Sequence, residues 1–324
     1  MSEIKIGLIG GSGLAQVLAE STQGTRHEID TPFGAPSDAI VEADWAGLPM
    51  FVLARHGPGH RLGPAQVPFR ANIFALKKLG VTHIIASGAV GSLREEFRPR
   101  DLVIPDQIID KTVHRPASFF ENAAVHVEFA EPFCPVLRRI LIEEGQAQGQ
   151  PSERSSTVHD RGCYVCMEGP AFSTRAESLM HRLWGGDLIG MTAMPEARLA
   201  REAEIPYALV ALVTDYDCWR KKPAAKSATP TADVGASAEA RATAGVVADE
   251  DVLLKEIIAN LAAASDNGIA LIRRAIERIA ARPGEVADCP ARHALRLAIW
   301  TDKTRIPRDQ VELLAPLWMK YFGE

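Results

Sequence analysis

The chain has 324 residues, of which 47% are apolar and 24% are charged, so it can bury a large core and is globular over most of its length. Its formal net charge of −5, with lysines and arginines scattered along the chain, excludes a surface built to bind nucleic acid. No apolar stretch is long enough to cross a bilayer and no secretory leader precedes the first expected strand, so we expect a cytoplasmic protein with no membrane partner.

One large α/β domain or two smaller ones are both compatible with this length. The five cysteines, an odd number, fit reduced thiols better than a disulfide framework. Cys163 and Cys166 form a CxxC pair, but they lie within a strand-like run and no second pair completes a zinc site. A metal or redox site is therefore the less favoured interpretation, and we expect no metal.

The first expected strand, residues 4–9, is followed by Gly10-Gly11-Ser12-Gly13. Glycines at a strand end let backbone N–H groups approach an anion, and Ser12 adds a hydroxyl donor, although a plain tight turn is equally compatible. A second buried strand, residues 50–54, ends in Arg55 and His56. The arginine fork suits phosphate or carboxylate, and a structural salt bridge is the alternative.

A helix is expected over residues 65–79, and a third strand, 83–86, leads into a second loop of small residues, 87–92, that contains Gly88 and Ala89. Ligands bind outside the strand ends of open α/β sheets. We therefore expect the three strand ends to converge on one pocket. A short strand over 101–105, a surface loop over 112–127 with His114 and His126, and a helix over 131–144 follow.

Thr174 and Glu177 form a capping box that should start a helix ending at Trp184. Phe172 and Ser173 then lie in the loop before this helix. A phenyl ring with an adjacent hydroxyl can stack on a flat heterocycle and orient it, whereas Phe172 can equally serve as a hydrophobic staple.

The stretch from Gly190 to Trp219 carries the most specific chemistry. Pro195 suits the first position of a helix, so Thr192 should lie just before a helix N-terminus, where anions bind. A buried strand over 208–213 is followed by Asp215 and Asp217, which can both face one pocket. Burial and mutual repulsion favour a proton on this pair, which can then act as a proton donor near neutral pH. Two solvated carboxylates in an Asx turn are the alternative.

Residues 221–245 are rich in Ala, Pro, Ser, Thr and Lys, and their composition predicts a flexible insertion. C-terminal helices are expected within 251–322, over 251–281, 291–299 and 308–322.

Several of these segments together resemble the S-methyl-5'-thioadenosine phosphorylases of the purine nucleoside phosphorylase family, over most of residues 4–219. The matching segments are Gly10-Gly11-Ser12-Gly13-Leu14, Thr31-Pro32-Phe33-Gly34, Ala54-Arg55-His56-Gly57, Ala89-Val90-Gly91-Ser92-Leu93-Arg94-Glu95, Ala130-Glu131-Pro132-Phe133-Cys134-Pro135, Glu168-Gly169-Pro170, Phe172-Ser173-Thr174-Arg175-Ala176-Glu177-Ser178, Met191-Thr192 and Thr214-Asp215-Tyr216-Asp217-Cys218-Trp219.

The resemblance implies a single α/β domain over residues 1–324, with a mixed and partly barrel-like central sheet flanked by helices, in a homotrimer. It also implies residue roles: phosphate would be bound by Ser12, Arg55, His56, Gly88, Ala89 and Thr192, and the nucleoside by Met191, Phe172, Ser173, Asp215, Asp217 and, from a neighbouring subunit, His126.

The implied reaction is phosphorolysis of S-methyl-5'-thioadenosine to adenine and 5-methylthioribose 1-phosphate in purine and methionine salvage, with Asp215 and Asp217 as catalytic residues. Inorganic phosphate is the co-substrate, and no cofactor is expected. A phosphorylase acting on methylthioinosine or on purine nucleosides in general, a hydrolytic nucleosidase and a non-catalytic nucleoside-binding protein remain alternatives. Gly88 stands where some relatives carry threonine, which puts phosphate affinity in question.

Overall fold

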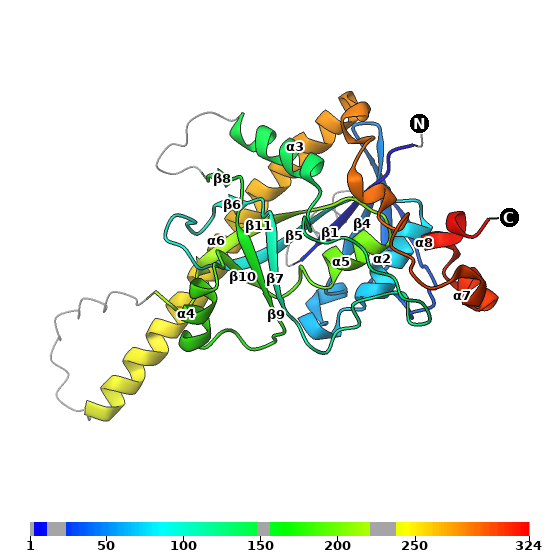
Figure 1. The fold of residues 1–324 in the computed structure, drawn as a ribbon. Coiled ribbons are helices and arrows are strands. Elements are labelled where there is room, and N and C mark those ends of the chain that lie inside the picture. The colour runs from blue at the N-terminus through cyan, green and yellow to red at the C-terminus, as the bar shows by residue number, and fades with distance from the viewer. Residues whose placement is uncertain (1–2, 12–23, 148–155, 221–237, 324) are drawn as a thin grey trace.

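The computed structural model describes residues 3–11, 24–147, 156–220 and 238–323 (Figure 1). Within the last range, it describes only the backbone of residues 238–254. The strands are β1 (Ile6–Gly10), β2 (Thr25–His27), β3 (Ile40–Trp45), β4 (Leu48–Ala54), β5 (His83–Ser92), β6 (Leu102–Val103), β7 (Gln107–Lys111), β8 (Val158–His159), β9 (Cys163–Met167), β10 (Leu188–Gly190) and β11 (Tyr207–Tyr216). The α-helices are α2 (Phe69–Lys78), α3 (Pro135–Gln146), α4 (Arg175–Leu183), α5 (Glu196–Glu202), α6 (Ala238–Ala281), α7 (Arg308–Leu313) and α8 (Ala315–Trp318). Short 3-10 helices are η1 (Pro58–His60), η2 (Pro64–Gln66), η3 (Pro283–Val286), η4 (Pro290–His293), η5 (Lys303–Arg305) and η6 (Met319–Tyr321).

The strands form one mixed sheet with the order β2-β3-β4-β1-β5-β10-β9-β7, and β11, β6 and β8 branch from it. Strand β5 is the central strand of this sheet. One edge of β5 pairs with β1 over its first half and with β10 at its end, and the other edge pairs with β11 along nearly its whole length. The predicted single α/β domain with a mixed central sheet is confirmed.

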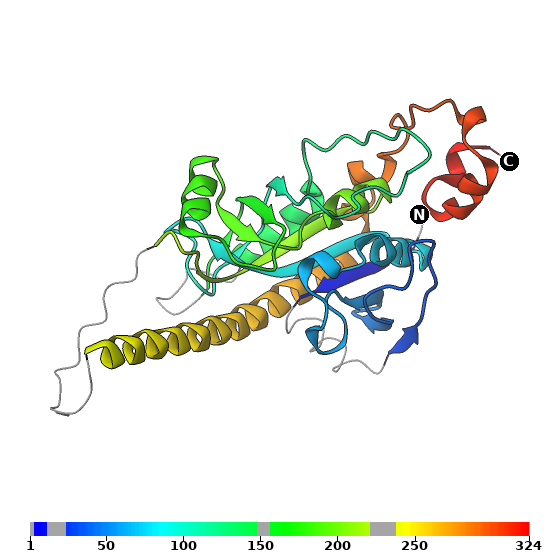
Figure 2. The same cartoon turned by 90° about the horizontal axis from the view of Figure 1, so that it is seen from below.

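Helices cover both faces of this sheet. Alternate side chains of β5 and β11, such as Ile84 and Leu209, pack with α2 and α5, whereas their neighbours, such as Ile85 and Val210, pack with α3 and α6. Because strand side chains alternate between faces, a strand covered on both sides must be apolar throughout, as β11 is up to Val213. Figure 2 shows the long helix α6 running beneath the strands.

Strand β5 is longer than the sequence predicted. It continues from His83 through Ser92 and stays paired with β11, so Gly88 and Ala89 lie within a strand. The prediction of a loop over 87–92 is therefore wrong. Small residues lower strand propensity, but pairing with β11 and β10 overrides that preference.

Helix boundaries also differ. The expected helix over 65–79 is interrupted by Pro68, and only η2 and α2 form. The helix expected over 291–299 is absent from that described segment, where η4 is the one regular element. The helix expected over 308–322 is divided into α7, α8 and η6.

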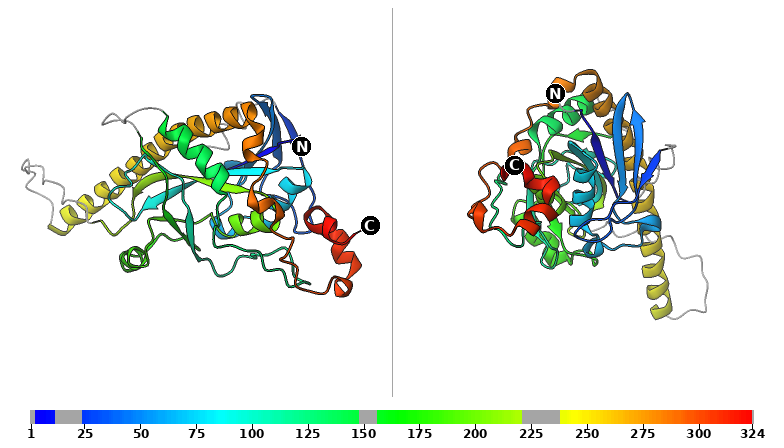
Figure 3. Two further views of the ribbon diagram at one scale, coloured as in Figure 1. Left: turned by 45° about the horizontal axis from the view of Figure 1, so that its top comes forward. Right: turned by 90° about the vertical axis from the view of Figure 1, so that its right-hand side faces the viewer.

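Helix α6 begins at Ala238, well before the expected start at Asp251, so the end of the expected insertion, residues 238–245, is helical. The rest of that insertion, 221–237, lies outside the described residues. One end of α6 lies towards α4, at the opposite end of the molecule from α7 and α8 (Figure 3). Within the described ranges, no helix combines the length and apolarity that a membrane span requires.

Candidate active site

Arg55 is the most buried charge of the predicted phosphate site. It follows β4, which lies beside β1 in the parallel part of the sheet, and its backbone N–H donates to the carbonyl of Gly10 at 3.0 Å. The convergence of these two strand ends is therefore confirmed. Ser12, two residues beyond Gly10, lies outside the described residues.

The Arg55 side chain, 1% exposed, is held in a bidentate ion pair with Glu196. Its Nε and Nη2 atoms donate to the two carboxylate oxygens at 2.8 Å each, and Nη1 donates to the carbonyl of Ser87 at 2.8 Å. Tyr207 also donates its hydroxyl to Glu196 at 2.8 Å. Burial alone would lower the pKa of Arg55, but the adjacent Glu196 raises it above its ordinary value. The salt bridge, which the sequence left as an alternative to phosphate binding, is present.

His56 lies beside this pair as a neutral ring. Burial lowers its pKa to about 4, so the imidazole is uncharged at neutral pH. Its Nδ1 is 2.8 Å from the carbonyl of Leu62, and only a protonated Nδ1 can make that hydrogen bond. The ring nitrogen Nε2 therefore carries a lone pair and cannot donate to a phosphate dianion.

Thr192 approaches the same region from the loop between β10 and α5. A Cβ on Gly88 would lie 3.3 Å from the Thr192 hydroxyl oxygen, so this hydroxyl lies against the backbone of β5. The Thr192 N–H donates to the Tyr164 hydroxyl at 3.3 Å. Pro195 is the N-cap of α5 and not its first residue, so the helix begins one position later than predicted.

Arg115 fixes the loop that carries Met191. Its side chain is 1% exposed, pairs with Glu168 at 3.1 Å and donates to the carbonyls of Met191 and Met194 at 2.6 and 2.7 Å. The sequence analysis missed Arg115, because a single arginine in an aperiodic loop carries no signal of its burial. It also missed the partner role of Glu196, since nothing in the sequence connects that glutamate to Arg55.

Asp215 and Asp217 meet at the far end of β5. A Cβ on Gly91 would lie 3.3 Å from Cβ of Asp217 and 3.6 Å from Oδ2 of Asp215, so both residues lie against this glycine. Asp215 belongs to β11, whose pairing with β5 shifts by one residue between Val213 and Asp215. Such bulges redirect the side chains that follow them.

The two carboxylates have different surroundings. Burial raises the pKa of Asp215, the Thr214 hydroxyl opposes the rise by donating to Oδ1 at 2.7 Å, and the charge of Asp217 adds to it. Asp217 is 8% exposed, and its buried Oδ2 has no hydrogen-bond partner among the described residues.

The arginine and the acidic pair lie along one strand, at Ser87 and Gly91 of β5. A strand advances about 3.3 Å per residue, so the two positions are roughly 13 Å apart. Ala89 lies between them and is exposed, although Gly88 and Val90 on either side are buried. That Arg55, Thr192, Asp215 and Asp217 share one site along β5 stays a prediction.

Three other predicted residues lie differently. Ser173 is near the acidic pair, because its carbonyl accepts from the Cys218 thiol at 3.2 Å. Phe172 is 85% exposed, so it does not act as a hydrophobic staple for α4, and its stacking on a base stays a prediction. The predicted capping box of Thr174 and Glu177 at α4 is confirmed. His126 is exposed and packs against Trp300, with ring centroids 4.6 Å apart.

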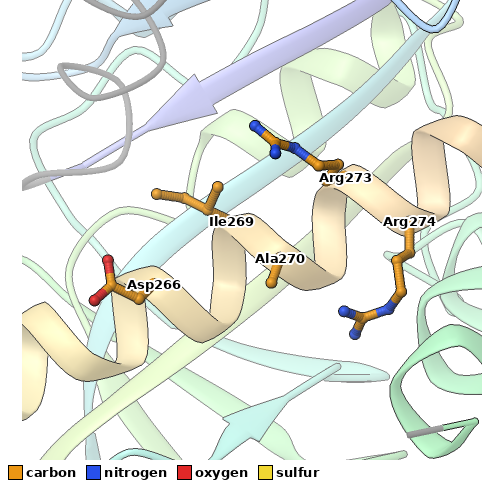
Figure 4. Close-up of a pocket in the computed structure, with 5 residues that line it drawn as sticks. All are labelled: Asp266, Ile269, Ala270, Arg273 and Arg274. Carbon is orange, nitrogen blue, oxygen red and sulfur yellow. The ribbon is translucent and has the colours of Figure 1, made fainter.

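A separate hollow lies on the surface of α6, with a volume of about 370 Å³ (Figure 4). It contains none of the predicted site residues and is lined by Asp266, Ile269, Ala270, Arg273 and Arg274. We therefore do not assign it to the active site.

Comparison with known proteins identifies the family. The model of the phosphorylase superfamily matches residues 5–277. The S-methyl-5'-thioadenosine phosphorylase of Gloeobacter violaceus is 44% identical over 321 residues, which cover 98% of this chain and 96% of that protein. The S-methyl-5'-thioadenosine phosphorylase of Geobacter sulfurreducens is 45% identical over 312 residues, covering 95% and 96% of the two chains.

Solved structures agree with these relatives. A methylthioadenosine phosphorylase from an antarctic soil metagenomic library is 41% identical, with a TM-score of 0.81 and coverage of 98% of this chain and 99% of that chain. The Schistosoma mansoni methylthioadenosine phosphorylase in complex with adenine is 31% identical, with a TM-score of 0.75 and coverage of 92% and 99%. The chain therefore belongs to the S-methyl-5'-thioadenosine phosphorylase family, within the phosphorylase superfamily.

Proposed function

We propose that this chain catalyses the phosphorolysis of S-methyl-5'-thioadenosine to adenine and 5-methylthioribose 1-phosphate. Relatives that match this chain over nearly their whole length are named for this activity. A phosphate oxygen attacks C1' of the ribose, the bond from C1' to the purine breaks, and the purine leaves with the bonding electrons. The site must therefore supply a clamped nucleophile at one end and a proton at the other.

Phosphate binding is assigned to the Arg55 end. Glu196 neutralises the charge of Arg55, so we expect phosphate to be bound mainly by hydrogen-bond donors: the remaining N–H groups of Arg55, the Thr192 hydroxyl, Ser12 and the backbone at Gly88 and Ala89. For His56 the backbone N–H is the proposed donor, because its ring has no proton to offer on Nε2.

Proton donation is assigned to Asp215. Its raised pKa keeps a proton on the acidic pair at higher pH than an ordinary aspartate would allow, so it can protonate N7 of the leaving purine. Met191, Phe172 and Ser173 remain the proposed contacts to ribose and base.

The observation that carries the choice of adenine is the acidic pair, because Asp215 and Asp217 lie together against Gly91. The 6-amino group of adenine is a donor, and a carboxylate of this pair can accept from it. A 6-oxo purine would place an acceptor against it, leaving a buried mismatch of about 1–3 kcal/mol. The structure therefore favours a 6-amino substrate over methylthioinosine or inosine.

The test is purine release from S-methyl-5'-thioadenosine with and without phosphate. We expect release only with phosphate, and slower turnover of adenosine and of 6-oxo nucleosides. Release that is indifferent to phosphate would show a hydrolase. Binding without turnover, unchanged by Asp215→Asn, would show a nucleoside-binding protein.

We also infer a homotrimer, because the predicted role of His126 requires a neighbouring subunit. Two apolar surface patches support it: one around α4, with Leu183 87% and Trp184 51% exposed, and one with Leu297 82% and Trp300 71% exposed. Different patches that bind head to tail around an axis close into a ring. In this arrangement His126, which packs on Trp300, would enter the neighbouring subunit's site near Phe172.

Sedimentation of Leu183→Glu tests this assembly. We expect the variant to dissociate, whereas Thr25→Glu, on the exposed edge strand β2, should sediment like the unmodified protein. A Leu183→Glu variant that remains trimeric would contradict the proposed interface. The cytoplasmic location stays a prediction.

A further inference from the structure

The bulge in β11 places Asp215, and the contacts that hold this bulge come from outside the proposed site. Thr214 is the extra residue in the pairing of β11 with β5. Its hydroxyl is 3.2 Å from the carbonyl of Val90 and donates to Asp215 at 2.7 Å. An extra residue leaves backbone groups without ladder partners, and buried groups of this kind must find others.

Two residues satisfy the carbonyls at the bulge. The backbone N–H of Arg100 donates to the carbonyl of Val213 at 2.8 Å. The side-chain amide of Asn260, on α6, donates from Nδ2 to the carbonyl of Thr214 at 3.0 Å. Arg100 in turn donates from Nε to Oδ1 of Asn260 at 2.8 Å, which links the two residues.

Only an amide of this length meets both demands. Nε of Arg100 can only donate and the carbonyl of Thr214 can only accept, so the group between them must offer one acceptor and one donor. This also fixes the orientation of the Asn260 amide. Asn260 is 5% exposed, so water cannot readily replace it. Aspartate has the same shape but no donor for Thr214, and leucine offers neither atom.

We propose that Asn260 is a positioning residue for Asp215: by holding the bulge at Thr214, it sets the direction of the carboxyl group that protonates the purine. This inference rests on the proposed function for the role of Asp215. It makes α6 a part of the active-site support, although α6 lies on the opposite face of the sheet from α5, which carries Glu196.

Asn260→Asp tests the contact, because it keeps the size of the side chain and its bond to Arg100 and removes the donor to Thr214; the negative charge that it adds is paired with Arg100. We expect kcat for S-methyl-5'-thioadenosine to fall about tenfold to a hundredfold, since a misplacement of about 1 Å costs that much, while KM for phosphate stays nearly unchanged. Arg100→Ala keeps its backbone bond to Val213 and should lower kcat less.

Leu271→Ala is the control for a loss of stability alone. Leu271 is fully buried on α6 and packs in the α3 and α6 core, away from the bulge. It should lower the melting temperature at least as much as Asn260→Asp and leave kcat nearly unchanged. If the two variants lose kcat in proportion to their melting temperatures, Asn260 is structural and the inference is wrong.

The structure of the Asn260→Asp variant supplies a readout that does not depend on turnover. Asp215 should lose its pairing with Gly91 or turn away from Asp217. An unchanged bulge together with an unchanged kcat overturns the inference. Absent turnover in the unmodified enzyme refutes the proposed function instead, and the position of Asp215 in the variant then still decides whether Asn260 holds the bulge.

Discussion

The two ends of the candidate site differ in how their buried polar groups are satisfied. At the Arg55 end, the guanidinium has Glu196 and the carbonyl of Ser87 as partners, and Tyr207 completes Glu196. At the acidic end, the Oδ2 atom of Asp217 has no partner in the described part of the chain. The described side chains therefore satisfy the buried polar groups at the Arg55 end, whereas one buried oxygen at the acidic end has no partner among them.

Substitutions at the two ends should therefore have different effects, on stability at one end and on selectivity at the other. Breaking the buried pair at the Arg55 end leaves an uncompensated charge in the folded protein, so substitutions there should lower stability as well as phosphate binding. At the acidic end the buried oxygen is already unsatisfied, so a substitution there breaks no completed contact of that oxygen. Substitutions there should change catalysis and base preference and leave stability nearly intact.

Asp215→Asn should have the largest effect on turnover. The amide keeps the shape of the side chain but has no acidic proton, so kcat should fall about 10²- to 10⁴-fold. Steady-state kinetics with S-methyl-5'-thioadenosine measures this, with KM for phosphate as the internal control. A fall of less than tenfold would mean that the purine receives its proton elsewhere.

Glu196→Gln should have the largest effect on stability. It leaves the buried Arg55 charge unpaired and should lower the free energy of unfolding by about 3–5 kcal/mol in urea denaturation. The double variant Arg55→Met with Glu196→Leu removes both charges, and we expect it to regain most of the stability but not the binding of phosphate. If Glu196→Gln has the same free energy of unfolding as the unmodified protein, the burial of Arg55 does not depend on Glu196.

The pH dependence should report the acidic pair. The active form holds a proton, so kcat should fall as pH rises through the raised pKa of Asp215. Asp217→Asn removes the neighbouring negative charge that contributes to this rise, so the fall should move to lower pH. A shift towards higher pH would contradict the assignment of Asp215 as the acid.

Gly88→Ala should have the smallest effect. Its new Cβ would lie 3.3 Å from the Thr192 hydroxyl oxygen, a tight contact that a small displacement of Thr192 relieves. Overpacking of this kind costs about 1 kcal/mol, so KM for phosphate should rise by less than about tenfold and kcat should hardly change. An unchanged KM for phosphate would place Thr192 outside the phosphate site.

The sequence predicted those parts of the fold that depend on local chemistry. The apolar run of β11, the capping box of α4 and the convergence of Gly10 with Arg55 all follow from patterns of neighbouring residues. It failed where distant partners decide the local structure. Small residues at 87–92 resemble a loop, and only β11 makes them a strand.

The candidate site shows the same division. The spacing of Asp215 and Asp217 was sufficient to predict an acidic pair, and the position of Arg55 after a strand indicated a cation that binds phosphate or a carboxylate. Nothing local connects Arg55 with Glu196, or Asn260 with the carbonyl of Thr214. These contacts join elements far apart in the chain, so they become visible only when the sheet and its two helix layers are assembled.

The most direct measurement is a crystal structure of the protein with adenine and phosphate bound together. We expect phosphate against Arg55 and Thr192, the amino group of adenine within about 3.2 Å of a carboxylate oxygen of the acidic pair, and N7 facing Asp215. Adenine bound away from the acidic pair, or a phosphate in a cleft that adenine does not share, would contradict the common site along β5.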